Sequence, residues 1–456
     1  MNNFLKERRG DFRKVLRRIF RRDFSGNAGI AIKNSTYQLG SNMVVKIGSL
    51  IFTIILARLL LPEKFGLYSL ALSTIILFSA FADFGIASAI VTFIPKELKK
   101  KNFKKAKGYF LIFLKWKIYL LIIVSLAMVV FGYFISNNYY QKPIYLALIA
   151  GIFYIFFSGL LGFLELFLKA NGNFKASFFK ELIFQISRII LIALTFVIIF
   201  KNSSDSVLTA GVIFVLSVCF LLASIYLFMK INKINYLKYK KQSLNKKEYK
   251  SLIKFILPLF AIVLSGVFFG YIDTIMLGGN VSAQFLSYYS IAFSLIGSIV
   301  AVLGFSASSL HPLFSVTKGK ALEHLFRKAK AITIMFSFSG AVATLFLAEI
   351  IIKIAYGSAY LPSAPILKLF SVLVFLLPIS ALYDAYFLSQ KKTRSLAIIL
   401  IFATILNIVL NYFGIKYGIK YGEFGAIVGV SIASIFSKTT HLGGLILFKK
   451  ISKNIK

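Results

Sequence analysis

Long apolar stretches separated by short polar segments constrain this chain most. Hydrophobic residues fill 58% of its 456 positions and charged residues only 15%. The mean hydropathy of +0.82 exceeds what a water-soluble surface carries. Since about 20 apolar residues let a helix cross a ~30 Å hydrocarbon core, we predict an all-α, polytopic membrane protein of about twelve transmembrane helices. The predicted spans are 38–60, 68–92, 109–135, 143–168, 179–200, 206–229, 252–278, 284–310, 329–352, 364–389, 394–415 and 424–448.

The positions of the positive charges predict the orientation. The chain carries 54 Lys and Arg against 15 Asp and Glu, for a formal net charge of +39. With the N-terminus placed inside, about 40 of the 54 cations fall in predicted inner segments and about seven in outer ones. Cytoplasmic loops carry such an excess, so we predict a protein of the cytoplasmic membrane with both termini in the cytosol. The same segregation explains the basic character without a nucleic-acid partner.

Residues 1–34 form a basic cytosolic segment. Between residues 12 and 22, apolar side chains recur at helical spacing and Arg and Lys occupy the other face. This pattern predicts an amphipathic helix lying on the anionic lipid of the inner leaflet. A disordered basic tail attracted to the same lipid is the alternative.

The two halves of the chain resemble each other. Tyr68-Ser-Leu-Ala-Leu-Ser73 opens the second predicted helix, and Tyr289-Ser-Ile-Ala-Phe-Ser294 opens the eighth. The first six and the last six predicted helices form the two repeats. Because six is an even number of crossings, both repeats have the same orientation in the membrane and are related by a pseudo-two-fold axis along the membrane normal. A substrate site between the halves is common in such proteins. We predict a six-helix N-lobe (35–229), a basic cytosolic connector (230–250), a six-helix C-lobe (251–448) and a cytosolic tail (449–456).

The sequence favours no enzyme. It lacks a phosphate-binding G-x-x-x-x-G-K-[ST] loop, and its three histidines have no metal-ligand spacing. Cys219 is the single cysteine, which excludes a disulfide framework and a C-x-x-C redox site. The predicted outer loops are too short for the carboxylate-bearing loop expected of a membrane glycosyltransferase. We therefore predict no catalytic residue, no metal and no cofactor.

Three cations lie near the middle of predicted helices: Lys46, Arg188 and Lys438. An ionisable residue near the bilayer centre costs about 2.5–3.5 kcal/mol on insertion scales and usually faces a water-filled path or a partner. A cavity lined by these cations suits an anionic substrate such as a pyrophosphate, which Arg binds bidentately and Lys as a point charge. The alternative is snorkelling to the interface or local ion pairing.

Three carboxylates, Asp83, Asp273 and Asp384, also lie in predicted membrane segments. Such groups are frequent in proton or cation relays, so we assign them, with Arg58, to ion coupling or gating. Asp83 and Asp384 have an alternative place near the inner interface. Asp273 lies deeper, and we expect it to bind a coupling cation or to pair with Arg58.

Three segments resemble one known family. Residues 58–73 (RLLLPEKFGLYSLALS) resemble the signature between the first two helices of polysaccharide biosynthesis flippases, the Wzx-type group of the MATE-related MOP exporter superfamily. Phe81-Ala-Asp-Phe-Gly-Ile86 resembles that family's motif at the end of the second helix. Tyr271-Ile-Asp-Thr-Ile-Met-Leu-Gly278 resembles its counterpart in the seventh. At the motif positions Gly66 and Gly85, glycine would permit a tight turn or a close helix contact.

The resemblance implies a V-shaped, MATE-like pair of lobes around a central cavity. It also implies alternating access that moves a polyprenyl-(pyro)phosphate-linked oligosaccharide from the inner to the outer leaflet for surface polysaccharide export. The driving force would be a membrane potential or an ion gradient, with H⁺ or Na⁺ as coupling ion, and glycan-assembly proteins would be partners. The alternatives are a cation-coupled multidrug exporter of the same superfamily and a non-transporting membrane scaffold of glycan assembly.

Overall fold

The computed structural model describes residues 26–198, 203–303, 319–390 and 392–454, together with residues 310, 314 and 317. Regular structure within these residues is helical, without a strand. The amphipathic pattern between residues 12 and 22 lies outside them, so its conformation stays a prediction.

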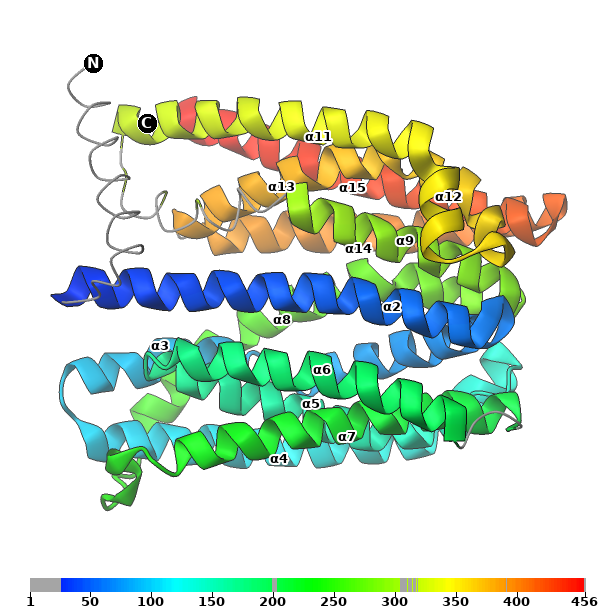
Figure 1. Ribbon diagram of the computed structural model, residues 1–456. Coiled ribbons are helices and arrows are strands. Elements are labelled where there is room, and N and C mark those ends of the chain that lie inside the picture. Colours follow the sequence, from blue (N-terminus) through cyan, green and yellow to red (C-terminus); the bar gives the residue numbers. More distant parts are fainter. Residues whose placement is uncertain are drawn as a thin grey trace.

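The first long element, α2 (Gly26–Phe81), contains two helices joined at a sharp turn. Leu61 leaves the helical region with φ 60° and ψ 171°, and Pro62 follows it. Proline suits the first turn of a new helix, where its missing N–H has no partner to lose. The chain therefore turns back at Leu61, and the two parts of α2 run antiparallel (Figure 1).

The second predicted crossing, 68–92, is interrupted near its end. After α2 stops at Phe81, Phe84 and Gly85 take positive φ values of 44° and 76° before α3 (Ile86–Lys99) begins. A β-carbon at Gly85 would lie 2.9 Å from the carbonyl oxygen of Ile256. Gly85 thus serves both a left-handed turn and a close contact with another helix, as its motif position predicts.

The remaining long helices follow the predicted spans. They are α4 (Phe103–Phe134), α5 (Tyr145–Ala170), α6 (Phe174–Ile198), α7 (Asp205–Ile231), α8 (Lys246–Gly278), α9 (Ala283–Leu303), α11 (Gly319–Ala355), α13 (Ser371–Ser389), α14 (Thr393–Gly418) and α15 (Gly422–Asn454). Short elements join them: η1 (Ile135–Tyr140), η2 (Asn235–Lys238), η3 (Ser358–Ser363), α12 (Ala364–Leu369) and η4 (Ile419–Tyr421).

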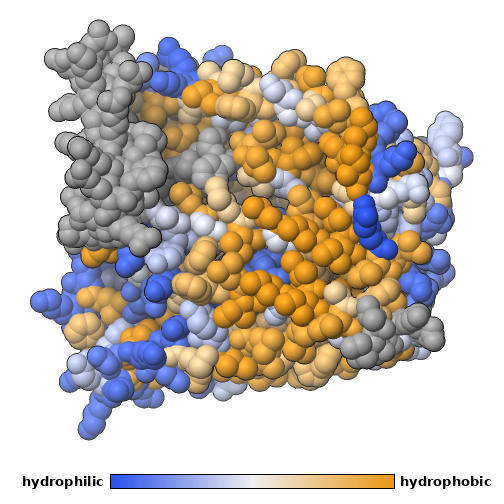
Figure 2. All heavy atoms as spheres, viewed as in Figure 1, coloured by the Kyte–Doolittle hydropathy of each residue, from blue (hydrophilic) through white to orange (hydrophobic). Residues whose placement is uncertain are grey.

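The predicted multi-pass membrane fold is confirmed. Nine segments of the described chain are long and apolar enough to cross a membrane, and two of them, Lys33–Phe81 and Thr393–Ile451, each contain two helices. With α6, which is outside that set, the described residues contain twelve long helical segments, one for each predicted crossing. Figure 2 shows apolar side chains over the middle of the bundle and hydrophilic ones toward its two ends.

The helices run along one common direction. α2 begins and α15 ends at the same end of the bundle, where α7 also leads into α8 (Figure 1). We call this the terminal end and the other the opposite end. α5 packs on α4 and α7, and α14 packs on α15, whereas α8 touches α2, α3 and α14. Because α8 and α9 contact helices of both sequence halves, the two-lobe division stays a prediction.

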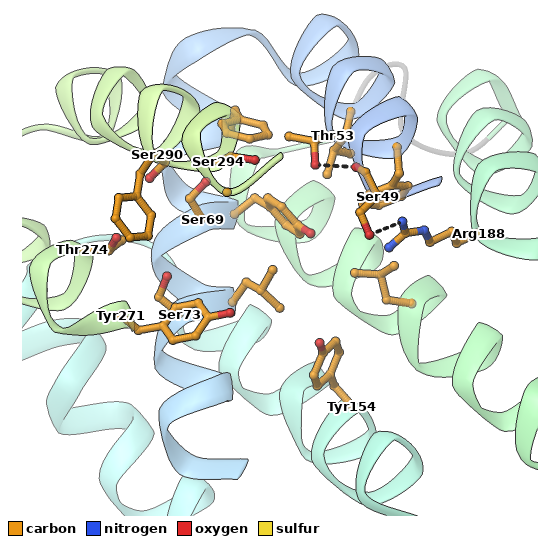
Figure 3. Close-up of a pocket in the computed structure, with 18 of the residues that line it drawn as sticks. Ser49, Thr53, Ser69, Ser73, Tyr154, Arg188, Tyr271, Thr274, Ser290 and Ser294 are labelled. Carbon is orange, nitrogen blue, oxygen red and sulfur yellow. Dashed lines mark hydrogen bonds between the residues drawn. The ribbon is translucent and has the colours of Figure 1, made fainter. Parts of the chain in front are cut away.

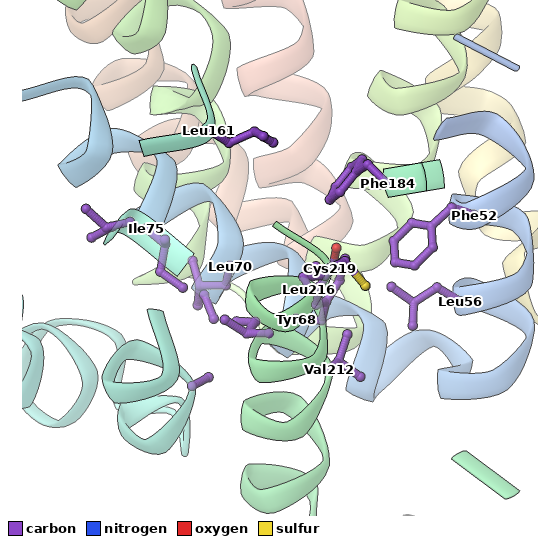
Figure 4. Close-up of a cluster of buried hydrophobic side chains, with 14 of the residues drawn as sticks. Phe52, Leu56, Tyr68, Leu70, Ile75, Leu161, Phe184, Val212, Leu216 and Cys219 are labelled. Atoms are coloured by element: carbon purple, nitrogen blue, oxygen red, sulfur yellow. The ribbon is translucent and has the colours of Figure 1, made fainter. Parts of the chain in front are cut away.

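The apolar core of the first half lies where α2, α5, α6 and α7 meet. Leu56, Leu70 and Ile75 of α2 are fully buried there, and Cys219 of α7 is also buried (Figure 4). This packing fixes the rotation of each helix about its axis. It therefore decides which polar side chains face the cavity described next.

Candidate functional site

A cavity of about 590 Å³ opens between helices of both sequence halves. Both parts of α2, together with α5, α6 and α7, supply one wall, and α8 and α9 supply the other (Figure 3). Substrate sites of repeated membrane transporters lie at such a junction between repeats. The position agrees with the site expected between the halves.

Arg188 of α6 is the charged side chain of this lining. Its Nη2 donates a hydrogen bond of 3.1 Å to the Ser49 hydroxyl (Figure 3). Its guanidinium carbon lies 4.4 Å from the centroid of the Phe52 ring and 5.2 Å from that of Phe184. Its Nε has no hydrogen-bond partner among the described residues. Arg188 is thus held by two aromatic rings while part of its donor capacity stays unused.

Residues with a hydroxyl group or an aromatic ring make up most of the rest of the cavity lining. A hydroxyl both donates and accepts, so several of them facing one space can bind a polyhydroxylated ligand. Aromatic rings offer flat apolar faces beside them. The hydroxyl-bearing residues are Ser49, Thr53, Ser69, Ser73, Thr274, Ser290 and Ser294 with Tyr68, Tyr154 and Tyr271, and the phenylalanines are Phe52, Phe65, Phe184, Phe220 and Phe293.

The structure corrects the expected set of cavity cations, because Lys46 and Lys438 do not line this cavity. Lys46 is exposed on α2. Lys438 of α15 is buried between helices of the second half, where its Nζ donates to the Phe269 carbonyl at 3.2 Å. The same Nζ lies 4.0 Å from the centroid of the Phe269 ring. Position along a helix was predicted correctly for both lysines, but the rotation of the helix was not.

Asp273 is the centre of a buried polar cluster in the second half. Only 3% of the residue is exposed. Its Oδ2 accepts a hydrogen bond of 2.6 Å from the Tyr289 hydroxyl and another from Ser434, and its Oδ1 accepts one of 2.7 Å from Asn411. The carboxylate therefore joins α8, α9, α14 and α15.

The expected pairing of Asp273 with Arg58 is wrong. The Arg58 guanidinium instead donates to the carbonyl oxygens of Ile354 and Ala355 at the end of α11. Neutral donors from three other helices already surround Asp273, and Arg58 lies at the opposite end of the bundle. The alternative for Asp273, binding a coupling cation, stays a prediction.

Asn407 and Asn411 belong to this buried polar region but were missed in the sequence, and Tyr289 was noted there as part of the internal repeat and not as a partner of Asp273. Asn407 is fully buried, and neither polar atom of its amide has a partner among the described residues. The signal was present, because Asn407 and Asn411 are spaced by one helical turn inside an apolar span. Polar residues repeated on one face of a membrane helix usually mark a buried contact.

Asp83 and Asp384 occupy two separate places. Asp83 lies in the break between α2 and α3, with its Oδ1 3.9 Å from Nζ of Lys117. That lysine is 5% exposed and donates to the Ala82 carbonyl at 2.8 Å. The Asp384 Oδ1 lies 3.9 Å from Nε2 of His441. Neither carboxylate lines the central cavity, and the described residues contain no group of three side chains suited to a metal.

Comparison with known proteins places the chain in a family. Residues 31–318, which include every residue that lines the cavity, match the polysaccharide biosynthesis protein family. The chain belongs to that family. The predicted resemblance to its members is confirmed, and an overlapping region, residues 258–413, matches the MatE family. No curated protein matches the chain significantly.

Solved structures share the fold of this polysaccharide biosynthesis family member. The lipid II flippase MurJ in an inward closed conformation is similar with a TM-score of 0.68 and 17% identity, over 90% of this chain and 87% of that one. An inward-facing multidrug resistance MATE family transporter of the MOP superfamily is similar with a TM-score of 0.62 and 14% identity, over 92% of this chain and 96% of that one. A MOP superfamily transporter from Pyrococcus furiosus is similar with a TM-score of 0.54 and 15% identity, over 92% of this chain and 97% of that one. At these identities the likeness supports the fold.

Proposed function

We propose that this protein flips a polyprenyl-(pyro)phosphate-linked oligosaccharide from the inner to the outer leaflet for surface glycan export. The observation that carries the proposal is the composition of the cavity. One arginine lies among hydroxyl groups and aromatic rings, between the two halves of a chain from a polysaccharide biosynthesis family. The MurJ and MATE neighbours are a lipid II flippase and a multidrug transporter of the same fold, which supports transport over catalysis.

In this proposal the cavity receives the head group of the lipid while the polyprenyl tail stays in the bilayer. Arg188 contacts the phosphate through charge-assisted hydrogen bonds from the end of its guanidinium, whose Nη2 already donates to Ser49 in the cavity wall. The cavity hydroxyls exchange hydrogen bonds with the sugar and so replace water. Alternating access then exposes the cavity to one side of the membrane at a time.

Asp273 is the proposed coupling group in this cycle. Its carboxylate accepts hydrogen bonds from neutral donors and lies within electrostatic reach of the buried Lys438, and uptake of H⁺ or Na⁺ would neutralise it. Because the carboxylate joins four helices of the second half, a change in its charge would alter their packing. This links ion binding to the movement of one half against the other.

The first test removes the charge of Arg188. We expect Arg188→Gln to weaken the apparent affinity for the lipid-linked oligosaccharide about 10- to 100-fold, since a hydrogen bond to a charged group contributes about 1.5–3 kcal/mol. Leaflet-resolved measurement of the lipid in depleted cells carrying the variant checks this, with accumulation expected on the cytoplasmic side. Lys46→Gln is the matched control, because Lys46 is a cation of the same bundle outside the cavity. An unchanged leaflet distribution after depletion of the protein would sink the proposal.

The MatE match over residues 258–413 favours a second candidate, a cation-coupled multidrug exporter. Such a cavity should be acidic to hold cationic drugs, whereas the charged side chain here is Arg188. Sensitivity to toxic cations without loss of surface glycan would support the exporter. A non-transporting scaffold would instead keep glycan assembly intact in the Arg188→Gln variant.

A further inference from the structure

At the opposite end of the bundle, two cations of the first half each bind the end of a helix from the second half. Arg58 of α2 donates from Nε to the Ala355 carbonyl at 2.8 Å and from Nη2 to the Ile354 carbonyl. Lys142, after η1, donates from Nζ to the Gly278 carbonyl at 2.6 Å. Ala355 is the last residue of α11 and Gly278 is the last residue of α8.

These contacts follow a general electrostatic rule. The last carbonyl groups of a helix have no partner within the helix and carry a partial negative charge. A cation placed there supplies both a hydrogen bond and a favourable charge. Here each cation comes from the half of the chain before the connector and each helix end from the half after it. Both contacts therefore last only while the two halves touch at this end.

A third contact between the two halves lies at this end, next to the cavity. The Tyr360 hydroxyl, in η3, donates to the Ala57 carbonyl at 2.9 Å, and Tyr360 is fully buried. The Tyr360 ring packs edge-on against Phe65, with 6.1 Å between centroids. Phe65 lines the cavity. The contacts of Arg58 and Tyr360 thus hold the residues that cover the cavity on this side.

The segment that carries Lys142 is held firmly in place. The Lys142 amide donates to the Ser136 carbonyl at 3.1 Å, and the Ser136 hydroxyl donates to the Lys142 carbonyl at 2.8 Å. Tyr140 shares a buried hydrogen bond of 2.9 Å with Thr74 of α2. Because these bonds hold the backbone of Lys142 in place, less conformational entropy is lost when its side chain binds the end of α8.

We propose that Arg58 and Lys142 form a latch that closes the cavity toward the opposite end by capping α11 and α8. The cycle opens this end by breaking both caps, and the helix ends then bind water. The proposal rests on the alternating access of the proposed function and adds the groups that hold one gate shut. The substrate and the coupling ion do not enter it.

Access to the cavity, rather than transport, tests the latch. In a Cys219→Ser background, which removes the single native cysteine, Ser290→Cys places one thiol in the cavity wall. Intact cells are treated with a membrane-impermeant maleimide, which reaches the opposite end because the termini are predicted to lie in the cytosol. The rate at which the Ser290→Cys thiol is labelled is measured. We expect Arg58→Ala with Lys142→Ala to raise that rate about tenfold, equivalent to about 1.4 kcal/mol toward the open state. The charge-keeping pair Arg58→Lys with Lys142→Arg should stay near the parent rate.

Lys64→Ala is the matched control for the latch. Lys64 is also a cation at this end, but it pairs at 3.2 Å with Asp205 of its own half, so its loss should leave the rate unchanged. A double variant that labels at the parent rate, or a control that labels as fast as the double variant, overturns the latch. Loss of the proposed function looks different: labelling responds as expected while the lipid-linked oligosaccharide stays evenly distributed after depletion.

Discussion

At the scale of single residues, Arg188 and Asp273 illustrate two ways to keep a charge inside the membrane. Arg188 lies between two rings and forms no ion pair with a carboxylate in the described chain. Its Nε is buried without a hydrogen-bond partner among the described residues. Asp273 is instead saturated by hydroxyl and amide donors. The first arrangement suits a ligand, and the second suits a group that responds to an ion.

The ion-coupling role proposed for Asp273 gives a prediction at this scale. We expect Asp273→Asn to abolish the dependence of lipid flipping on an imposed H⁺ or Na⁺ gradient, because the side chain can no longer change charge. The new amide would also face existing donors, which costs about 1–3 kcal/mol. Flipping in vesicles under each gradient, with the thermal midpoint of unfolding, measures both effects.

Tyr289→Phe is the companion variant. It removes one donor and keeps the carboxylate, so it should lower the free energy of unfolding by about 1.5–3 kcal/mol, as for a hydrogen bond to a charged group, and leave the ion dependence intact. If the Asp273→Asn protein kept its ion dependence, the coupling role would be lost.

At the scale of elements, the break at Leu61 and the contact at Gly66 set the geometry of the first two crossings. A β-carbon at Gly66 would lie 1.7 Å from the carbonyl oxygen of Ala283, at the start of α9. The backbones of α2 and α9 therefore meet directly, as the motif position of Gly66 predicts. This contact joins the two halves beside the cavity.

Gly66→Ala should consequently separate α2 from α9. We expect the variant to lose about 2–3 kcal/mol of stability, since the added methyl group meets backbone that cannot rotate away. Thermal unfolding of the purified protein in detergent measures the loss. Gly162→Ala is the control, because a β-carbon there would meet no atom within 4 Å. Equal midpoints for the two variants would contradict the close contact.

At the scale of the whole molecule, the two ends of the bundle differ in charge and in what they join. The terminal end holds the Lys-rich connector between α7 and α8, and the opposite end holds the contacts of Arg58 and Lys142. By the excess of positive charge, we predict that the terminal end lies in the cytosol. The proposed gate would then face the outside of the cell.

The orientation gives the last prediction. In the Cys219→Ser background, we expect Lys238→Cys in η2 to react with an impermeant maleimide only in everted vesicles, and Lys420→Cys in η4 only in intact cells. Both positions lie in short segments between membrane helices. Labelling of both from one side of the membrane would refute the predicted topology.

Much of the fold was predictable because it depends on local properties of the chain. Each apolar stretch marks a crossing, and the polar loops mark where the crossing begins and ends. The number of helices therefore followed from the sequence. The motif position of Gly85 predicts a tight turn, but the interruption of the second crossing at Phe84 and Gly85 did not follow from the sequence, because it depends on the approach of α8. Burial of Lys117 was likewise not predictable, since its partner carbonyl exists only at that break.

The sequence by itself therefore determined that the chain folds in a membrane and which segments form its helices, and it predicted their orientation. Hydrophobicity and charge act on each segment separately, so these properties need no tertiary structure. Only the tertiary structure decided that Arg188 faces the cavity while Lys46 and Lys438 do not. It also decided that Arg58 caps α11 and that Asp273 is bound by neutral donors. These outcomes depend on how each helix is rotated about its axis and on contacts between residues more than 100 positions apart, such as Arg58 with Ala355 (297 positions). Packing of all the helices together sets both.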